Sequence, residues 1–378
     1  MKIVFLVSSM HAGGAERVAA TLANAWSARG EAVTLVPTYT KKGSCFYPVS
    51  EQVDMVWLAD RIRRLRLPVP AGLKKWLALR RLVREKKPDL IVSFLTNVNV
   101  VALLSTRGLG IPIIVCERTN PAFNNNVGWV LRLLRKMTYR FADLVTVQTE
   151  ASVAPFQRMM PGIERLAVIP NPVPPELFDA RLAACVPDVN GRLRLVAMGR
   201  LVPAKQFDLL IDAFGKIAAH RPEWDLTIWG DGPMRDALLR QIESMGLSSR
   251  IDLPGRTDTP WQQLAQAHAF VLTSRVEGFP NVLLEAMAIG LPCLAVDCPS
   301  GPREMTHNGE DALLVPLADQ QALTQGLDRL LGDAALRRVL AERGSLSVRK
   351  RYGLDAVLDS WDRLMEQVGI SRVRREET

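Results

Sequence analysis

The chain has 378 residues, of which 48% are hydrophobic and 23% charged, so it is long enough for two domains that each bury a core. This composition excludes the disordered and fibrous classes. No apolar run is long enough to span a bilayer, and the apolar start of the chain runs into a glycine turn instead of a signal-peptide cleavage site. Five cysteines, without a Cys-x-x-Cys spacing, favour reduced thiols, as in a cytosolic protein.

The formal net charge of +9 is concentrated in one segment. Residues 61–87 contain eleven Lys or Arg and a single acid, Glu85, which gives a local charge of +10 and leaves −1 for the rest of the chain. A basic segment in an otherwise neutral chain indicates an acidic partner.

The first half of the chain alternates apolar strands with amphipathic helices. Residues 2–9 predict a strand that ends at a glycine turn, and residues 15–29 predict the helix that follows. Further strands are expected at 32–37, 54–58, 89–94, 111–116 and 144–148, and further helices at 73–84, 97–105 and 127–141. This order predicts a Rossmann-like unit with a parallel sheet covered on both faces. The absence of G-x-G-x-x-G argues against a dehydrogenase.

The expected helix at 73–84 carries much of the basic charge. Its apolar face is predicted to comprise Leu73, Trp76, Leu77, Leu79, Leu82 and Val83. Its other positions hold Lys74, Lys75, Arg80, Arg81 and Arg84. The apolar face is expected to pack on the sheet and the basic face to remain accessible.

A proline-rich stretch separates this unit from a second one. Prolines crowd residues 170–187, and the interdomain connection is therefore placed at 170–192. In the second unit, strands are expected at 193–199, 225–229, 251–253, 269–272 and 293–296, and helices at 207–219, 234–245, 261–267 and 281–288. Residues 316–378 are expected to be mostly helical.

The stretch from 269 to 288 predicts a strand, a tight turn and a helix N-terminus. Pro280 precedes the helix and Gly290 follows it, as helix boundaries favour. A helix N-terminus suits a phosphate group. Glu277 lies in the turn and Glu285 lies eight positions later. Because carboxylates accept hydrogen bonds from sugar hydroxyls, the pattern indicates a nucleotide sugar.

Other strand ends carry glycines and cations. Arg200 and Lys205 follow the first strand of the second unit, and an arginine fork with a lysine point charge suits a diphosphate. Residues 230–233 (GDGP) and 255–256 (GR) follow two further strands, and residues 13–17 (GGAER) follow the first strand of the chain.

These motifs, in this order, resemble the retaining glycosyltransferases of family 4, which have the GT-B architecture and an E-x7-E motif, in particular bacterial polysaccharide, O-antigen and lipid-linked oligosaccharide enzymes. The resemblance covers nearly the whole chain. It implies an α/β fold with two Rossmann-like domains facing a central cleft: an acceptor-binding domain at 1–169, the linker at 170–192, a nucleotide-sugar-binding domain at 193–352, and a C-terminal helix at 353–378 that crosses back to the first domain, with 360–367 as the candidate.

The resemblance also implies residue roles. The catalytic residues would be Glu277, which orients the transferred sugar, and Arg200 and Lys205, which stabilise the leaving diphosphate. Glu285 would bind ribose. Further donor-binding residues would be Gly13, Gly14, Arg118, Gly199, Gly230, Asp231, Arg256, Gly278, Phe279, Pro280, Asn281 and Leu283. Where many relatives carry a histidine, this chain has Glu117 and Arg118, and Arg118 would donate to the sugar or a phosphate. Without Asp-x-Asp near a strand end, neither metal nor cofactor is expected.

The implied reaction is retaining transfer of a hexose or N-acetylhexosamine from a nucleotide sugar, UDP-linked by the resemblance of residues 300–304 (SGPRE), to a polyprenyl-diphosphate-linked saccharide. Acceptor and anionic-membrane contacts are expected from Lys74, Lys75, Trp76, Arg80, Arg81 and Arg84, extended by Arg132, Arg135, Lys136 and Arg140. The protein would be peripheral on the cytoplasmic face of the membrane. The alternatives are a GT-B epimerase or phosphorylase, and a nucleic-acid-binding protein using residues 61–87. Nucleic acid is not expected as a partner, because no recognised module and no interleaved aromatics accompany the charge.

Overall fold

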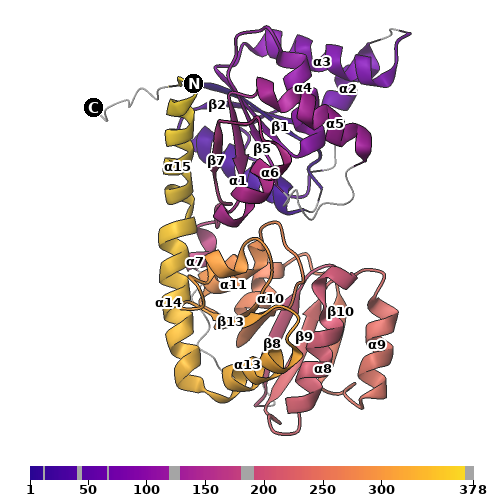
Figure 1. Cartoon of the computed structure of the whole chain (residues 1–378), viewed down its shortest axis with the longest axis vertical. Coiled ribbons are helices and arrows are strands. Elements are labelled where there is room, and N and C mark those ends of the chain that lie inside the picture. Colours follow the sequence, from indigo (N-terminus) through magenta and orange to yellow (C-terminus); the bar gives the residue numbers. More distant parts are fainter. Residues whose placement is uncertain (12, 41–44, 66–67, 119–127, 180–190, 371–378) are drawn as a thin grey trace. The chain divides into compact units, whose positions relative to one another are not determined.

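The computed structural model describes residues 1–11, 13–40, 45–65, 68–118, 128–179 and 191–370. The chain divides into two compact units (Figure 1). Unit 1 comprises the described parts of Met1–Pro172 and Asp355–Thr378, and unit 2 comprises those of Val173–Leu354. Each unit has its own parallel sheet, as the sequence predicts.

Unit 1 contains a seven-stranded sheet in the order β3-β2-β1-β4-β5-β6-β7. Its five inner strands are almost wholly buried, which explains their unbroken apolar runs, whereas the two short edge strands are partly exposed. The strands are β1 (Lys2–Val7), β2 (Ala32–Pro37), β3 (Asp54–Met55), β4 (Leu90–Phe94), β5 (Ile113–Cys116), β6 (Leu144–Val147) and β7 (Leu166–Val168). The expected strand at 54–58 is wrong beyond Met55, because Leu58 begins a helix, and β7 is a strand that the sequence pattern does not reveal.

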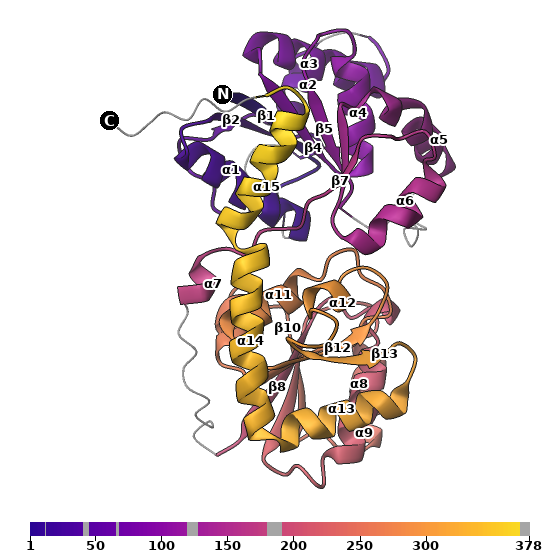
Figure 2. The ribbon, with the colours of Figure 1, turned by 60° about the vertical axis from the view of Figure 1, so that its left-hand side comes forward.

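Helices cover both faces of this sheet. On one face lie α2 (Leu58–Arg64), α3 (Ala71–Lys86), α4 (Thr96–Thr106), α5 (Trp129–Thr138) with η1 (Tyr139–Phe141), and α6 (Val153–Met159), which follows η2 (Glu150–Ser152). The other face is covered by α1 (Gly14–Ala28) and α15 (Leu354–Gln367) (Figure 2).

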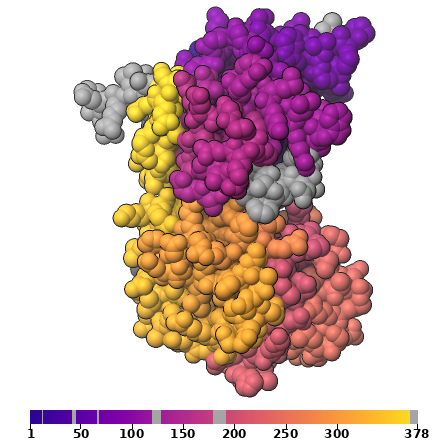
Figure 3. Space-filling model, viewed as in Figure 1, coloured from indigo at the N-terminus to yellow at the C-terminus, as the bar shows by residue number. Residues whose placement is uncertain are grey.

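The C-terminal helix α15 packs on unit 1 through aromatic and ionic contacts. The rings of Trp361 and Trp26 meet edge to face at 5.3 Å, and both residues are fully buried. Arg29 Nη1 lies 3.3 Å from Asp362 Oδ2. Figure 3 shows α15, in yellow, against the side of unit 1. Residues 360–367, the candidate for the returning helix, therefore lie in unit 1.

The buried face of α3 differs from the expected one. Its buried residues are Lys75, Ala78, Leu79, Leu82 and Val83, whereas Leu73 is 44% exposed. The spacing 75, 78, 79, 82, 83 is itself a regular helical stripe, and the aliphatic stem of the lysine occupies one of its positions. The expectation that Leu73 packs in the core and that Lys75 is accessible is therefore wrong.

Unit 2 contains a six-stranded parallel sheet in the order β10-β9-β8-β11-β12-β13. Its strands are β8 (Leu193–Met198), β9 (Trp224–Trp229), β10 (Ile251–Gly255), β11 (Ala269–Leu272), β12 (Cys293–Asp297) and β13 (Leu313–Pro316). Its helices are α7 (Glu176–Asp179), η3 (Pro203–Lys205), α8 (Phe207–Ile217), α9 (Arg235–Ser244), α10 (Pro260–Ala265), α11 (Asn281–Ile289), α12 (Pro302–Met305), α13 (Gln320–Gly332) and α14 (Ala334–Tyr352). The carboxyl ends of its strands bring the predicted motifs to one edge.

Candidate active site

The strand–turn–helix predicted around the two glutamates is present. Strand β11 is fully buried, α11 begins at Asn281, and Gly290 ends the helix in the left-handed conformation at φ +84°. Between them, the side chain of Glu277 is 12% exposed, and Glu285 is 4% exposed. Both carboxylates therefore belong to shielded surroundings in which each needs a partner.

Glu277 pairs with a second predicted catalytic residue. Lys205 Nζ lies 2.5 Å from Glu277 Oε1. The loop after β11 is bound to the loop after its neighbour β8, because Thr273 Oγ1 donates to the Lys205 carbonyl at 2.8 Å and Arg275 N donates to the Ala204 carbonyl at 2.8 Å. Two motifs 72 residues apart in the chain thus converge on one ion pair.

Arg200 lies in the same loop after β8. Its side chain is exposed, and no acidic partner lies within ion-pair distance of it among the residues described here. Arg200 and Lys205 therefore present cationic charge at the carboxyl edge of the sheet, and only Lys205 is neutralised.

Glu285 has a partner that the sequence does not reveal. The indole Nε1 of Trp261, on α10, donates to Glu285 Oε2 at 3.3 Å. The expected helix at 261–267 places Trp261 near a strand end, but no motif marks it as a site residue.

The glycines after β8 and β9 allow two loops to approach closely. A Cβ on Gly230 would lie 1.8 Å from the Gly199 carbonyl oxygen, and a Cβ on Gly232 would lie 2.5 Å from that of Leu201. Next to them, Asp231 and Arg256 form an open pair at 3.8 Å, in which the Arg256 side chain is 77% exposed. The glycines therefore have a packing role at this edge.

The turn before α11 is partly a core element. Phe279 is 8% exposed, and its ring lies 6.2 Å from that of Tyr352. Leu283 is fully buried, and its N–H donates to the Pro280 carbonyl at 3.0 Å. The Leu283 side chain therefore packs in the core, and its expected contact with the donor stays a prediction. Gly278 and Asn281 flank the turn at half-buried positions.

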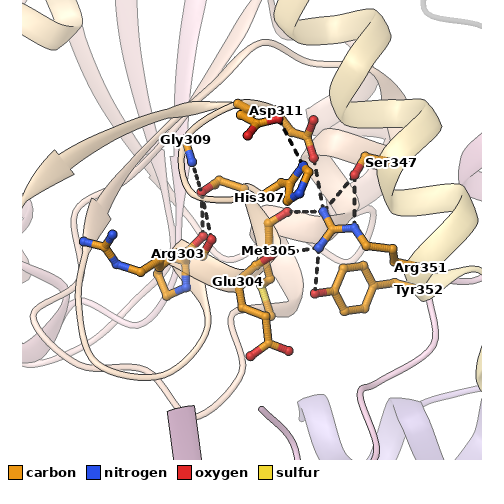
Figure 4. Close-up of polar contacts among 12 residues, drawn as sticks. Arg303, Glu304, Met305, His307, Gly309, Asp311, Ser347, Arg351 and Tyr352 are labelled. Carbon is orange, nitrogen blue, oxygen red and sulfur yellow. Dashed lines mark hydrogen bonds and ion pairs between the residues drawn. The ribbon is translucent and has the colours of Figure 1, made fainter. Parts of the chain in front are cut away.

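The segment after β12 supports the turn, and α14 holds that segment in place. Figure 4 shows the contacts that Arg351 of α14 makes with it. Gly301 adopts φ +121°, and a Cβ there would lie 2.6 Å from Pro280 Cδ. Arg351 of α14 donates to the carbonyls of Glu304 and Met305 at 2.7 and 2.8 Å, and also to Asp311 Oδ2 at 3.1 Å. This arginine fixes the end of α12.

In unit 1, the first glycine turn is held by its neighbours. Ser9 Oγ donates to Glu16 Oε1 at 2.7 Å, and Gly13 N donates to the Tyr47 hydroxyl at 3.2 Å. A Cβ on Gly13 would lie 2.3 Å from Glu16 Oε2, so this glycine leaves room for the carboxylate. Gly14 is the first residue of α1.

Glu117 is part of a buried network under the end of β5. Its carboxylate accepts from Tyr139 Oη at 2.5 Å and from Thr96 Oγ1 at 2.8 Å, and Arg135 Nη1 lies 3.7 Å away. Burial, followed by the nearby Glu117 charge, raises the pKa of Tyr139 well above its usual value. Arg135 is only 4% exposed, so its expected place in an accessible basic patch is wrong.

Part of the predicted basic surface is also engaged within unit 1. Lys75 is buried, with Nζ 2.9 Å from the centre of the Tyr39 ring, and burial lowers its pKa to about 7. Arg80 donates to the carbonyls of Ser105 and Arg107, each at 2.9 Å, and Trp76 Nε1 donates to that of Leu104 at 3.0 Å. Arg81 and Arg84 are exposed, and Lys74 is half-buried.

Helix α5 adds an exposed apolar stripe. Trp129 is 77% exposed, Leu133 50% and Met137 52%, and the exposed cations Arg132, Lys136 and Arg140 lie among or just beyond them. Within the described ranges, no helix is long and apolar enough to cross a membrane. In the same part of the chain, no group of three or more His, Cys, Asp or Glu side chains is arranged to hold a metal ion.

Comparison with known proteins identifies the fold and the class of enzyme. The chain matches the "Glycosyl transferase 4-like domain" over residues 13–172 and "Glycosyl transferases group 1" over residues 187–346. The solved structure of HepE from Anabaena, in complex with UDP, is similar at a TM-score of 0.80 and 21% identity, over 97% of this chain and 100% of that one. The protein has the GT-B architecture and is a glycosyltransferase. Its first half belongs to the glycosyl transferase 4-like family and its second half to glycosyl transferases group 1.

Two curated relatives extend over nearly all of this chain. The first is the GalNAc-α-(1→4)-GalNAc-α-(1→3)-diNAcBac-PP-undecaprenol α-1,4-N-acetyl-D-galactosaminyltransferase of Campylobacter jejuni, at 27% identity over 97% of this chain and 99% of the relative. The second is an exopolysaccharide phosphotransferase of Streptomyces coelicolor, at 30% identity over 97% of this chain, which spans 41% of that protein.

Proposed function

We propose that this glycosyltransferase moves a hexose or N-acetylhexosamine from a UDP-linked donor to a polyprenyl-diphosphate-linked saccharide, with retention of configuration, in bacterial surface polysaccharide or glycan biosynthesis. The observation that carries the proposal is the Lys205–Glu277 pair beside Arg200 and the α11 N-terminus. The two cations and the helix N-terminus can bind a diphosphate, and the carboxylate can accept hydrogen bonds from sugar hydroxyls. The names of the Campylobacter relative and of the UDP-bound HepE support the choice of acceptor and nucleotide.

The charge arrangement supports a reaction in which no metal takes part. As the bond between the anomeric carbon and the diphosphate oxygen breaks, negative charge grows on the leaving group, where Arg200, Lys205 and the α11 N-terminus stabilise it. The acceptor hydroxyl attacks from the same face, and its proton passes to the leaving phosphate oxygen. Glu277 orients the sugar and forms no covalent bond, while Glu285, held by Trp261, binds the ribose hydroxyls.

An acceptor with a lipid tail requires the enzyme to reach a membrane surface. The exposed residues of α5 combine Trp129, Leu133 and Met137 with basic neighbours, which is the composition of a helix that lies at a lipid interface. The exposed Arg81 and Arg84 of α3 add attraction to anionic headgroups. We therefore place the protein at the cytoplasmic face of the membrane as a peripheral protein.

The test is an in vitro transfer assay. The full chain is incubated with individual UDP-sugars and a synthetic polyprenyl-diphosphate saccharide, with and without EDTA. Product with an anomeric configuration equal to that of the donor, at an EDTA-insensitive rate, is the expected result. Inversion, or a loss of activity that Mg²⁺ restores, would contradict the retaining or metal-independent mechanism. Epimerisation of the donor, or cleavage of a glycan that depends on inorganic phosphate, without transfer would support the alternative GT-B activities. Salt-sensitive retention of nucleic acid on filters would support the nucleic-acid alternative.

A further inference from the structure

Arg118 is a buried cation at the carboxyl edge of the sheet of unit 1. It follows β5 and is 7% exposed. Its guanidinium carbon lies 3.5 Å from the centre of the Phe94 ring, at the end of β4, and Nη1 donates to Asn171 Oδ1 at 2.6 Å. Gln148, just after β6, donates to the same oxygen at 3.0 Å. Three neighbouring strand ends therefore contribute to the surroundings of this side chain.

The charge of Arg118 has no counter-charge in these surroundings. Nε and Nη2 are buried and have no hydrogen-bond partner within the described ranges, and no carboxylate there lies within ion-pair distance of the guanidinium. The adjacent acid, Glu117, is committed to Tyr139, Thr96 and Arg135. Arg118 thus differs from Arg135, which is equally buried but lies beside a carboxylate.

An arginine in this position remains charged. Burial lowers the pKa of Arg118 to about 10, so the guanidinium is protonated at neutral pH. Buried charges in proteins are normally paired, and an unpaired one is destabilising. The planar fork can bind a carboxylate or a phosphate through two parallel hydrogen bonds, and ligands of open parallel sheets bind at the carboxyl ends of the strands.

We infer that Arg118 is the centre of an oxyanion subsite in unit 1, which binds a carboxylate or phosphate group of a substrate. Asn171 accepts from Nη1 and is itself held by Gln148, and the guanidinium lies over the Phe94 ring. The inference rests on the proposed function in one respect: the bound oxyanion is expected to belong to a sugar nucleotide, a sugar phosphate or a sugar acid.

The first experiment measures binding of simple oxyanions by calorimetry. The full chain carries Arg200→Gln and Lys205→Gln, which remove the cationic pair of unit 2. Inorganic pyrophosphate and D-glucuronate are the probes, and D-glucose is the neutral match to glucuronate. We expect one of the two anions to bind and glucose not to bind. Adding Arg118→Gln should weaken that binding by roughly 10-fold or more, as for a lost charge-assisted bond. The anion that binds tells whether the source is a phosphate or a carboxylate.

Two results would overturn the inference: neither anion binds, or Arg118→Gln leaves the affinity unchanged. The proposed function is judged separately, by UDP binding to the unmodified chain and its loss with Arg200→Gln and Lys205→Gln. Failure of UDP binding while an anion still binds at Arg118 would refute the proposed function and leave the subsite standing.

The second experiment uses thermal unfolding to distinguish a binding role from a structural one. Arg118→Gln removes an unpaired buried charge, so the Tm of the ligand-free chain should stay unchanged or rise. Arg135→Gln is the matched control, because it leaves the buried carboxylate of Glu117 without its cation and should lower the Tm. Equal destabilisation by both variants would show that Arg118 is structural and would refute the subsite.

Discussion

Lys205 Nζ and Glu277 Oε1 lie 2.5 Å apart, which joins the loop after β8 to the turn before α11. Each side chain is largely shielded from water, so each satisfies the other before any substrate is present. A bound nucleotide sugar would meet a lysine and a glutamate that already have fixed positions, which reduces the reorganisation required in the reaction.

Glu277→Gln is expected to lower kcat by about 10²-fold while the chain stays folded. The neutral amide leaves the charge of Lys205 unbalanced and has only one oxygen that can accept from the sugar hydroxyls. Initial rates with the donor identified by the transfer assay measure this effect. Glu310→Gln is the control, since Glu310 is also paired in unit 2, at 3.3 Å from His307, but on an exposed surface. Wild-type turnover by folded Glu277→Gln would disprove the role.

Arg200→Ala and Lys205→Ala are expected to act on the chemical step, each lowering kcat by roughly 10²-fold, because charge on the diphosphate grows toward the transition state. The comparison of kcat with KM measures this. Arg240→Ala serves as the control, since Arg240 is an exposed cation on α9 of the same unit and has no expected role in the site. A rise in KM with kcat unchanged would mean that the two cations bind the ground state only.

Local patterns explain why the positions of the two glutamates could be predicted from the sequence. Strand β11 and helix α11 are each specified by their own apolar runs and by Pro280 and Gly290, so Glu277 and Glu285 could be placed without tertiary information. The position of Trp261 against Glu285 could not be predicted, because it depends on how α10 packs beside α11.

The basic segment was harder to interpret for the same reason. The sequence pattern allows Lys75 to lie on either the buried or the exposed face of the helix. It is buried because α3 packs on the sheet and the lysine contacts the Tyr39 ring. Arg80 looks like a surface cation in sequence, but two carbonyls at the end of α4 bind it. Charge counts therefore overestimate the accessible charge of α3, whereas the exposed apolar stripe of α5 needs a structure to be seen.

Trp261→Phe tests whether the indole N–H positions Glu285. The ring remains and only the donor to Oε2 is lost, so the fold should be retained. We expect weaker UDP binding by several-fold and a reduced preference for UDP over 2′-deoxy-UDP, since a less constrained carboxylate distinguishes the ribose hydroxyl less well. Trp229→Phe is the matched control, because the Trp229 Nε1 is buried without a partner among the described residues. Unchanged discrimination would mean that the hydrogen bond has no part in ribose recognition.

Lys75→Met is expected to stabilise the protein in a pH-dependent way. The folded-state pKa of about 7 lies below the unfolded value of about 10.4, so the unfolded chain binds the additional proton between these two values. The destabilisation from Lys75 is therefore fully present below pH 7 and fades as the pH rises toward 10.4. Thermal unfolding at pH 6 and pH 9.5 should show a larger Tm gain at pH 6. Lys74→Met is the control, and a gain independent of pH would contradict the explanation by burial.

Helix α5 is expected to bind anionic membranes through both its apolar stripe and its cations. The variant Trp129→Ser with Leu133→Ser removes buried area in the lipid, and Arg132→Gln with Lys136→Gln removes attraction of about 1 kcal/mol per basic residue near the surface. Each variant should float with anionic liposomes less than the unmodified chain at low salt, and high salt should weaken the binding that depends on the cations.

The controls lie on α14 of unit 2: Leu346→Ser, an apolar residue 70% exposed, and Arg338→Gln with Arg343→Gln, which are exposed cations. Equal flotation of all variants, or no flotation of the unmodified chain, would exclude α5 as the membrane contact and would favour an acceptor free in solution.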